Sequence, residues 1–459
     1  MSYRSISYWF DSLGTEPLPR APLPGELEVD VAIVGGGFTG AWTAYYLKLA
    51  DPGCRVALLE ADTVGFGASG RNGGWCWPSV AGLSHHFERD PEKGDALRQA
   101  IAATIDEVGA VCASEGIEAD YRKGGGLTIA SNPAQAERVR ANVDAHRKLG
   151  WSEEDVHWLE PAELREHMRV ASCHGGMFSA QVARVNPAKL ARGVAAAAEK
   201  RGAQIYERTR VTRVEPGRVH TAHGVVRAQR IVLGLAGYLS QLAGHTREAI
   251  PAYNHMIATE PLSRETWERI GLASGKGFGD ASRFIIYAQR TADDRIAIGG
   301  RGLSYFYGSA IDPRFERNPR NDLLLQQALR EVIPDLGEVE ITHRWGGAFG
   351  ISRDMTASIN LDPATGIASA GGYVGDGVAA SNLAARTLSD LLSDRKSALV
   401  ELPWVGHQSP HWEPEPLRWL GVRAGTAINA SADAIENRTG RRARLHERAL
   451  QMLGAHLEY

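Results

Sequence analysis

Three glycines near the N-terminus have a spacing that suits phosphate binding. Gly35, Gly37 and Gly40 stand in the order G-x-G-x-x-G, directly after the short apolar run 30–34. In a strand–turn–helix unit the first glycine allows a tight turn and the second lets the backbone approach a pyrophosphate. The third lets helix and strand pack closely, and the helix N-terminus offers free N–H groups to the phosphates. The spacing predicts a dinucleotide site; the alternative is a plain glycine turn.

An acidic residue strengthens this prediction. Glu60 ends the next apolar run, 55–60, where a carboxylate in such a unit receives the hydroxyl groups of a ribose. The residues expected to contact the dinucleotide in this first part of the site are Gly35, Gly37, Phe38, Thr39, Gly40, Glu60 and Ala61.

A second glycine-rich loop, residues 65–75, follows directly. Arg71 could meet a phosphate, and backbone amides beside glycine could reach a flat ring system. The alternative is a flexible surface loop. The residues expected to contact the ligand here are Gly67, Ala68, Ser69, Arg71, Asn72, Gly73, Gly74 and Trp75.

The elements that must position these loops fall into separated blocks. Strands at 30–34 and 55–60 with a helix at 41–49 make one βαβ unit. Further elements of the same kind are expected as a helix at 187–201 capped by Asn186, strands at 204–214, 230–235 and 367–370, and a helix at 378–392. Helices at 91–120 and 133–150 and strands at 250–260, 283–289 and 294–300 lie between the blocks. The order predicts an α/β protein with a discontinuous nucleotide domain and an inserted second domain.

Both ends of the chain differ from this pattern. Residues 1–28 are expected to form an extended strap, because four prolines occur between positions 17 and 24. Residues 401–459 are expected to form a tail rich in tryptophan and arginine that is helical after Ser431.

Composition excludes several classes of protein. The net charge is −3, which provides no basic surface for nucleic acid. The four cysteines include no C-x-x-C pair, so neither a zinc site nor a disulfide framework is indicated, and no metal is expected. Neither a signal peptide nor an apolar run long enough to span a membrane is apparent, so a cytoplasmic protein is expected.

At this point the chain resembles a known family. The two glycine loops, Glu60 and the late block Gly371-Gly-Tyr-Val-Gly-Asp-Gly-Val378 are similar to those of the D-amino-acid-oxidase-type FAD-dependent oxidoreductases, and the run 68–74 is nearest to the γ-glutamylputrescine oxidase branch. The resemblance implies FAD on a Rossmann-like domain of the glutathione-reductase type, with an inserted α+β substrate domain built on a mixed or antiparallel sheet. The implied limits are 1–28 for an extension, 29–85, 180–245 and 342–400 for the FAD domain, 86–179 and 246–341 for the substrate domain, and 401–459 for the tail.

The resemblance also assigns residues late in the chain to the cofactor. These are Val211, Ala236, Gly237, Gly372, Val374, Gly375, Asp376, Gly377 and Val378. Many relatives carry histidine where this chain has Asp376. Asp376 is expected either to cap the helix or to meet a cationic amine. The residues that tether FAD covalently in some relatives have no match here, so non-covalent FAD is expected; Cys76 lies nearest to such a position.

The chemistry implied by the family is hydride transfer to FAD from a C–H bond beside nitrogen, which needs positioning rather than a strong base. The candidates on the substrate side are Tyr287, Arg301, His255, Trp345 and Asp376. Arg301 could grip a carboxylate, or simply pack in its glycine-rich turn. Tyr287 could line the cavity or belong to the core, and His255 could be structural.

The resemblance leaves several functions open. One is an oxidase that converts a small amine or amino acid to an imine and passes electrons to O₂, giving H₂O₂. A second is a dehydrogenase that uses a quinone or an electron-transfer protein, and a third is a non-catalytic FAD-binding subunit. Oxidase relatives place a lysine near the flavin, and Lys276 is the only lysine within the inserted strand region. A monomer and a homodimer are both compatible with the sequence.

Overall fold

The first layer is a parallel sheet with helices on it, as expected from the βαβ spacing. The computed structural model describes residues 2–452. Five parallel strands lie in the order β9 (Gln204–Tyr206), β2 (Val56–Leu59), β1 (Leu27–Val34), β12 (Gly224–Leu233) and β19 (Ile367–Gly371). β18 (Ser358–Asp362) pairs antiparallel with β19, and the hairpin β10–β11 (Val211–Glu215, Arg218–Thr221) extends the start of β12. The Rossmann-like α/β prediction is confirmed.

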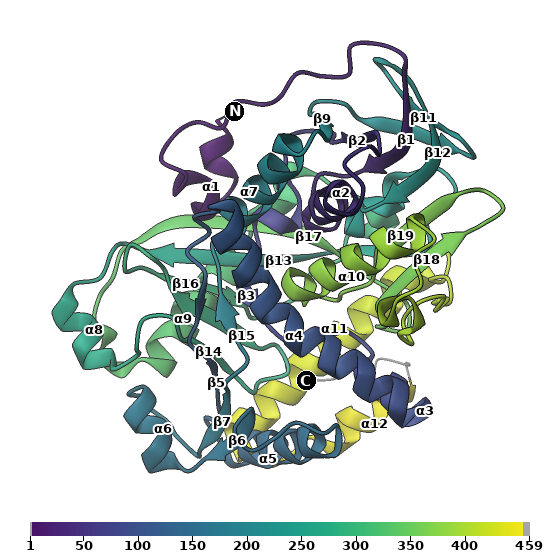
Figure 1. Ribbon diagram of the computed structural model, residues 1–459. Coiled ribbons are helices and arrows are strands. Elements are labelled where there is room, and N and C mark those ends of the chain that lie inside the picture. Colours follow the sequence, from purple (N-terminus) through teal and green to yellow (C-terminus); the bar gives the residue numbers. More distant parts are fainter. Residues whose placement is uncertain (1, 453–459) are drawn as a thin grey trace.

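Three helices pack side by side against this sheet (Figure 1). α2 (Phe38–Ala50) contacts both α7 (Pro187–Lys200) and α10 (Gly377–Leu392). The Asn186 side chain caps α7 by accepting a hydrogen bond from the N–H of Lys189 at 3.1 Å, as predicted. α4 (Pro91–Glu115) packs against α10 in the same apolar core.

The second layer is a mixed sheet of eight strands. Their order is β17 (Ile341–Ile351), β13 (Ile250–Thr259), β16 (Ile296–Gly300), β15 (Ile286–Arg290), β14 (Gly277–Asp280), β5 (Gly126–Ile129), β7 (Gly176–Ser179) and β6 (Val156–Leu159). Neighbouring strands are antiparallel except for β14 and β5. One face packs on α8 (Arg264–Ile270) and α9 (Pro319–Val332), and the other turns toward the glycine loops. A mixed substrate-side sheet was expected from the resemblance.

Smaller elements complete the chain. β3 (Trp75–Cys76), β8 (Ala183–Arg184) and β4 (Arg122–Lys123) form a three-stranded sheet. Further helices between the two layers' strands in the chain are α3 (Leu83–Arg89), α5 (Pro133–Lys148) and α6 (Pro161–His167). The predicted domain limits stay a prediction, and two elements lie on the other side of them. β17 was assigned to the FAD domain but lies in the second sheet, and α4 was assigned to the substrate domain but packs on the first layer.

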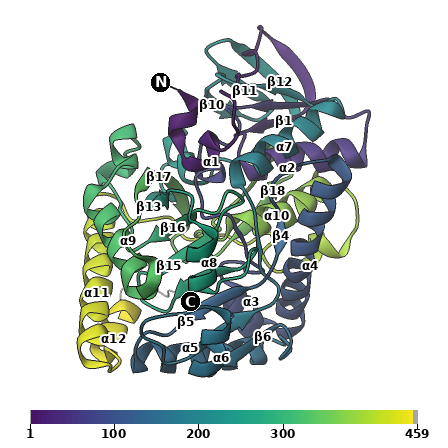
Figure 2. The ribbon, with the colours of Figure 1, turned by 90° about the vertical axis from the view of Figure 1, so that its left-hand side faces the viewer.

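Three local expectations hold only in part. The predicted strand 204–214 breaks into β9 and β10, because the chain turns at Arg208, whose φ is +53°. The tail is helical after Ser431, but its helix α11 (Leu417–Thr439) begins before that residue and lies at one edge of the molecule, followed by α12 (Arg444–Met452) (Figure 2). The N-terminus is not simply an extended strap, because Tyr3–Ile6 forms a 3₁₀ turn and α1 (Tyr8–Asp11) a short helix with three buried aromatic residues.

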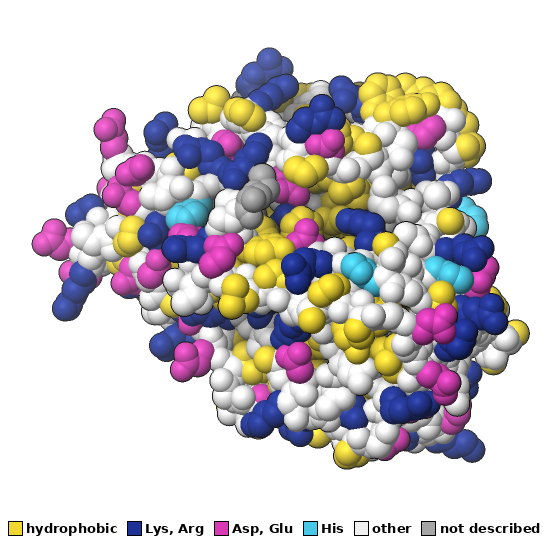
Figure 3. Space-filling model, turned by 90° about the horizontal axis from the view of Figure 1, so that it is seen from above, with side chains coloured by type: hydrophobic (Ala, Val, Ile, Leu, Met, Phe, Trp, Pro, Cys, Tyr) yellow, Lys and Arg dark blue, Asp and Glu magenta, His cyan; other side chains and the backbone are white. Residues whose placement is uncertain are grey.

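The surface carries mixed charge on the face seen from above. Positive and negative side chains are interspersed there, with apolar groups between them (Figure 3). In the described part of the chain, no helix combines the length and apolar character needed to cross a membrane.

Candidate cofactor and substrate site

Two helix N-termini meet at one edge of the parallel sheet. β1 leads into α2 and β19 leads into α10, and both strands flank β12. The Thr39 hydroxyl in the first turn of α2 lies 3.0 Å from the Tyr373 hydroxyl in the loop before α10. Neither helix has a side-chain hydrogen bond at its N-cap, which is Gly37 in α2 and Asp376 in α10. Apart from the N–H of Phe38, which donates to Ser69 Oγ, the N–H groups of these first turns meet no N-cap side chain, and with the two helix dipoles they favour an anionic ligand at this edge.

The first glycine loop has no room for side chains. Gly35 has φ +106°, and a Cβ on it would lie 2.6 Å from the carbonyl oxygen of Gly234. A Cβ on Gly40 would lie 1.9 Å from the carbonyl oxygen of Gly35. These contacts account for the tight turn and the close helix–strand packing that the spacing predicts, whereas contact with a cofactor stays a prediction.

Glu60 stands at the same edge, at the end of β2. Its Oε2 accepts a hydrogen bond from the N–H of Gly36 at 2.7 Å, and its Oε1 accepts one from the N–H of Asp62 at 2.8 Å. Burial raises the pKa of the Glu60 carboxyl to about 7, while these backbone N–H groups act in the opposite direction. The carboxylate is thus fixed in orientation beside the first glycine loop, where it can accept ribose hydroxyl groups.

The second glycine loop crosses from the first layer to the second. Ser69 Oγ accepts a hydrogen bond from the N–H of Phe38 at 2.8 Å, which ties the loop to the start of α2. At the other end, a Cβ on Gly73 would lie 2.5 Å from the ring of Tyr287 in β15. Gln289, two residues further along β15, donates from Nε2 to the carbonyl oxygen of Gly73 at 2.6 Å. The loop is therefore held at both ends, unlike a flexible surface loop.

Arg71 has its partners in the second layer and in the glycine loop itself. Its side chain is 2 % exposed and pairs with Glu316 of the second layer at 2.5 Å. Its guanidinium also lies over the ring of Phe66 and donates to the carbonyl oxygen of Gly346 at 3.3 Å. The expectation that Arg71 meets a phosphate is not supported, because Glu316 already balances its charge.

On the substrate side, Tyr287 and Trp345 lie on the sheet face that carries the glycine loop. Both belong to the apolar cluster shared with α1. Tyr287 is partly accessible, its hydroxyl has no hydrogen-bond partner among the described residues, and burial raises its pKa. Trp345 is 1 % exposed and donates from Nε1 to the carbonyl oxygen of Arg71 at 2.8 Å. The Tyr287 hydroxyl is thus available to contact a ligand, whereas Trp345 is buried and stabilises the glycine loop through its hydrogen bond to Arg71.

His255 lies on the opposite face of the sheet. Its Nε2 lies 2.9 Å from the carbonyl oxygen of Phe315, and burial lowers its pKa. Because side chains alternate along a strand, the neighbour Met256, not His255, shares the apolar cluster of Tyr287. The structure therefore separates His255 from Tyr287 and gives it the structural role that the sequence had left as the alternative.

Arg301 is also engaged elsewhere. Its guanidinium pairs with Asp280 at 2.8 Å and donates to the carbonyl oxygen of Phe284 at 3.1 Å. The Asp280 side chain is 3 % exposed, so the pair is largely desolvated. A substrate carboxylate would have to displace Asp280, and the expectation that Arg301 grips a substrate is not supported.

Asp376 is the one acidic candidate with an exposed side chain in this region. Its carboxyl has accessible surface, yet the surrounding protein raises its pKa through desolvation, and a hydrogen bond with Ser79 acts in the opposite direction. The exposed side chain stands at the N-terminus of α10, so a ligand can reach its carboxyl group. Because Asp376 makes no side-chain cap bond, its expected role as a helix cap is not what the structure shows.

The remaining residues predicted to contact the cofactor lie in or beside the loops and turns between the strands and helices of the first layer. Val211 begins β10 close to Glu60, since the N–H of Thr209 donates to the carbonyl oxygen of Glu60 at 2.8 Å. Ala236 and Gly237 begin the 3₁₀ turn after β12, and Gly237 packs on the backbone of Phe349. Ala61, Gly67, Ala68, Asn72, Gly74, Trp75, Gly372, Val374, Gly375, Gly377 and Val378 lie in the loops and first turns already described.

Two residues at this site, Gln289 and Tyr238, were not predicted from the sequence. Gln289 could have been found, because it shares the strand face of Tyr287 by the alternation of side chains. Tyr238 could not, because only the fold brings its ring to Gly67, where a Cβ would lie 3.3 Å away. Cys76, considered as a covalent tether for FAD, is buried in the core of the first layer. The Nζ of Lys276, considered as a lysine near the flavin, lies 2.7 Å from His167 Nδ1.

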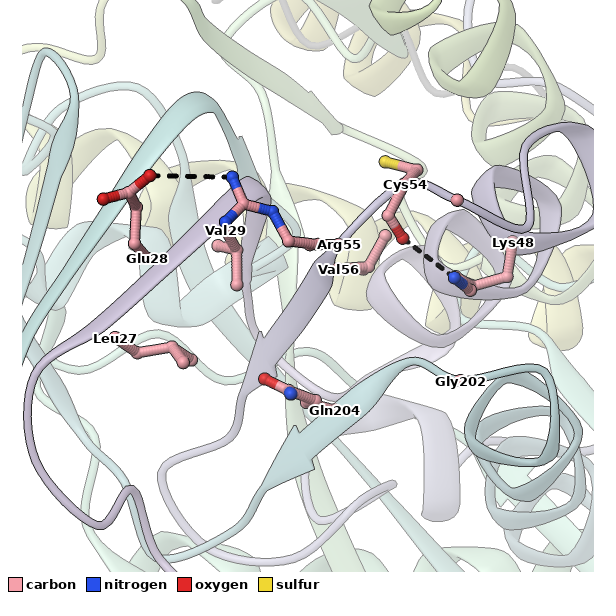
Figure 4. Close-up of a pocket in the computed structure, with 10 residues that line it drawn as sticks. Leu27, Glu28, Val29, Lys48, Cys54, Arg55, Val56, Gly202 and Gln204 are labelled. Atoms are coloured by element: carbon pink, nitrogen blue, oxygen red, sulfur yellow. Dashed lines mark hydrogen bonds and ion pairs between the residues drawn. The ribbon is translucent and has the colours of Figure 1, made fainter.

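A separate hollow lies at the other end of the parallel sheet. It is lined by the first residues of β1, β2 and β9, with Lys48 donating to the carbonyl oxygen of Cys54 at 2.8 Å and Arg55 paired with Glu28 at 3.7 Å (Figure 4). Ligands of open parallel sheets bind at the carboxyl ends of the strands. This hollow is at the amino ends and is not the candidate site.

Comparisons with known proteins agree with this arrangement. A sequence model of the DAO family, described as FAD dependent oxidoreductase, matches residues 30–391. The chain is 29 % identical over 421 residues to the γ-glutamylputrescine oxidoreductase of Escherichia coli (strain K12), covering 88 % of this chain and 93 % of that protein. It is 24 % identical to the glycine oxidase of Geobacillus kaustophilus (strain HTA426), covering 82 % of this chain and 96 % of that one.

Solved structures show the same fold. The crystal structure of glycine oxidase from Geobacillus kaustophilus superposes with a TM-score of 0.70 at 21 % identity, covering 83 % of this chain and 99 % of that one. L-proline dehydrogenase from P. horikoshii gives a TM-score of 0.67 at 17 % identity, covering 83 % and 96 %.

Proposed function

The chain belongs to the DAO family of FAD-dependent oxidoreductases, and from that premise we propose that it oxidises the carbon–nitrogen bond of a small amine or amino acid. Membership makes the protein an oxidoreductase with FAD as its cofactor. The relatives named above, a γ-glutamylputrescine oxidoreductase and a glycine oxidase, support a substrate of the amine or amino-acid class.

The described residues fit FAD. The uncapped N-terminus of α2 would hold the pyrophosphate, and Glu60 would accept the ribose hydroxyl groups. The second glycine loop and the N-terminus of α10 would hold the ring system, with α10 favouring negative charge near its first turn. We expect the cofactor to be bound without a covalent tether, because Cys76 points into the core beside Cys112.

The observation that carries the proposal is the carboxylate of Asp376. It is exposed at the N-terminus of α10, in the late glycine block that lies at the same edge of the parallel sheet as the first glycine loop. A desolvated carboxylate attracts a protonated amine strongly and gives no advantage to a neutral or anionic substrate. Asp376 would hold the nitrogen of the substrate or a second amino group, while Tyr287 would bound the space from the strand side.

The reaction balances as a two-electron oxidation. Bound FAD supplies the hydride acceptor. The substrate amine loses a proton, the C–H bond beside nitrogen breaks and its electron pair leaves with the hydrogen as hydride, and a C=N bond forms. Water then hydrolyses the imine to a carbonyl compound and ammonia, or an amine where the substrate is a secondary amine. We propose O₂ as the final acceptor, which takes two electrons and two protons to give H₂O₂. The residues of this chain contribute orientation and charge rather than a strong base.

The visible spectrum of the purified holoprotein in air-free buffer tests the proposal. Addition of γ-glutamylputrescine is expected to bleach the flavin absorbance, and admission of air is expected to restore it with formation of H₂O₂. Bleaching that recovers only with an added quinone would replace the oxidase by a dehydrogenase. Bleaching by another amine but not by γ-glutamylputrescine would change the substrate, and no bleaching across a panel of amines and amino acids would favour a non-catalytic FAD-binding subunit.

A further inference from the structure

Four consecutive carbonyl groups of the second glycine loop accept hydrogen bonds from side chains outside the loop. The donors are Ser7 Oγ to Gly70 at 2.8 Å, Trp345 Nε1 to Arg71 at 2.8 Å, Trp9 Nε1 to Asn72 at 2.7 Å and Gln289 Nε2 to Gly73 at 2.6 Å. Two come from the second sheet and two come from the first nine residues of the chain. The N-terminus thus supplies half of the side-chain hydrogen bonds that fix these carbonyl groups.

The N-terminal helix fills space that the loop leaves for it. A Cβ on Gly70 would lie 2.5 Å from the ring of Phe10, so α1 and the loop are in direct contact there. Trp9 is 2 % exposed and Phe10 is fully buried, which is the burial of a core element. This segment lies before residue 30, where the match to the family begins.

The same helix is bound to the second sheet. The Tyr8 hydroxyl donates to Asp293 in the turn between β15 and β16, and His343 Nε2 in β17 lies 3.1 Å from Asp11 Oδ2. The ring of Trp9 meets that of Trp345 edge to face, with 6.3 Å between ring centroids. α1 therefore joins the glycine loop to the β15–β16 turn and to β17.

The hydrogen bond of Trp9 sets the direction of one peptide group. In a planar trans peptide the C=O of one residue and the N–H of the next point in opposite directions. Because the carbonyl of Asn72 points to Trp9, the N–H of Gly73 points away from α1, and it has no acceptor among the described residues. A buried N–H needs an acceptor, and the loop in question is the one that fits the FAD ring system.

We infer that Trp9 is a positioning residue for the cofactor, and that α1 holds the second glycine loop in the conformation that binds FAD. Trp9 acts through the peptide between Asn72 and Gly73, and Ser7 acts in the same way on Gly70. The inference depends on FAD as the cofactor and not on the identity of the amine.

Trp9→Phe tests this, because it keeps an aromatic ring and removes the indole N–H. Trp404→Phe is the matched control: Trp404 is fully buried in the core of the first layer, and its Nε1 has no hydrogen-bond partner among the described residues. The rate at which FAD leaves diluted holoprotein, followed by the fluorescence of free flavin, is the readout. Loss of the net contribution of one hydrogen bond corresponds to roughly a two- to tenfold change in the rate of FAD release. We expect FAD to leave Trp9→Phe faster by that factor and to leave Trp404→Phe at the wild-type rate.

Thermal unfolding of the apoproteins separates positioning from general packing. Both variants lose part of a buried indole, so similar losses in Tm are expected, with the change in FAD release confined to Trp9→Phe. Ser7→Ala is expected to accelerate release in the same direction, and it serves as the test if Trp9→Phe does not fold. Equal FAD release from wild type, Trp9→Phe and Ser7→Ala would overturn the inference. Because no amine is present, a failure of the proposed reaction would leave this result unaffected.

Discussion

The ring of Tyr287 lies against the α-carbon of Gly73, so close that a Cβ on residue 73 would meet it at 2.5 Å. One residue belongs to a strand of the substrate-side sheet, and the other belongs to the loop that fits FAD. A Cβ on Gly299 in the neighbouring strand would meet the Tyr287 hydroxyl at the same distance. Tyr287 is thus held between two glycines, and the absence of two side chains sets the distance between loop and sheet.

Gly73→Ala is expected to weaken FAD binding more than tenfold. The added methyl must move either the ring of Tyr287 or the loop, and a close-packed site does not absorb such a shift without loss. Titration of the apoprotein with FAD, followed by flavin fluorescence, measures the effect. Gly421→Ala is the control, because a Cβ at that position of α11 meets nothing within 4 Å. Wild-type affinity in Gly73→Ala would mean that the contact does not constrain the loop.

The affinity for FAD is expected to depend on pH through Glu60. Burial raises the pKa of its carboxyl to about 7, so the carboxyl becomes protonated as the pH falls below that value. Ribose hydroxyl groups donate to the ionised form, so binding should strengthen as pH rises toward 7 and level off above it, with at most a tenfold change in Kd per pH unit. Titrations of the apoprotein from pH 5.5 to 8.5 measure this. In Glu60→Gln the slope should disappear, and a wild-type Kd that does not vary with pH would contradict the assignment.

The raised pKa of Glu60 also affects the stability of the apoprotein. Its folded-state pKa lies above the ordinary 4.5, so the folded state binds the extra proton. The stabilisation of the folded state by protonated Glu60 is fully present below the pKa of the carboxyl in the unfolded chain. It is lost as the pH rises through the folded-state pKa of about 7. Tm of the apoprotein should therefore fall across this window more steeply in the wild type than in Glu60→Gln.

Asp376→Asn is expected to raise KM for a cationic amine about tenfold, with a smaller effect on kcat. The substitution keeps the size of the side chain and removes its charge, and a charge-assisted hydrogen bond contributes about 1.5–3 kcal/mol. Steady-state kinetics with the amine found in the spectral test measure the change. Asp362→Asn, at the exposed end of β18, should behave as the wild type. An unchanged KM in Asp376→Asn would remove Asp376 from the substrate site.

The cofactor half of the site could be predicted from the sequence because its constraints are local. Gly35 and Gly40 contact each other five residues apart, and Asn186 caps the helix that it precedes. The substrate half depends on register and distant partners. Tyr287 and His255 are both polar aromatic residues on strands, and only the fold shows that they face opposite sides of the sheet. The role of α1 depends on the hydrogen bond between Trp9 and Asn72, which are 63 residues apart, so no local sequence pattern predicts it.

Arg301→Gln is expected to destabilise the protein by about 2 kcal/mol and to leave KM for carboxylate-containing substrates unchanged. Arg301 neutralises Asp280, whose side chain is 3 % exposed and also accepts hydrogen bonds from the N–H of Ile286 and the hydroxyl of Ser282. Removing one partner of a buried ion pair leaves the other charge uncompensated, which costs more than the pair contributes. The free energy of unfolding in denaturant measures the loss. Arg344→Gln is the control, because Arg344 is 42 % exposed and its nitrogen lies 3.9 Å from Asp322, so little change in stability is expected. A variant Arg301→Gln with wild-type stability but a raised KM would restore the role in substrate binding that the pattern of glycines around it had suggested.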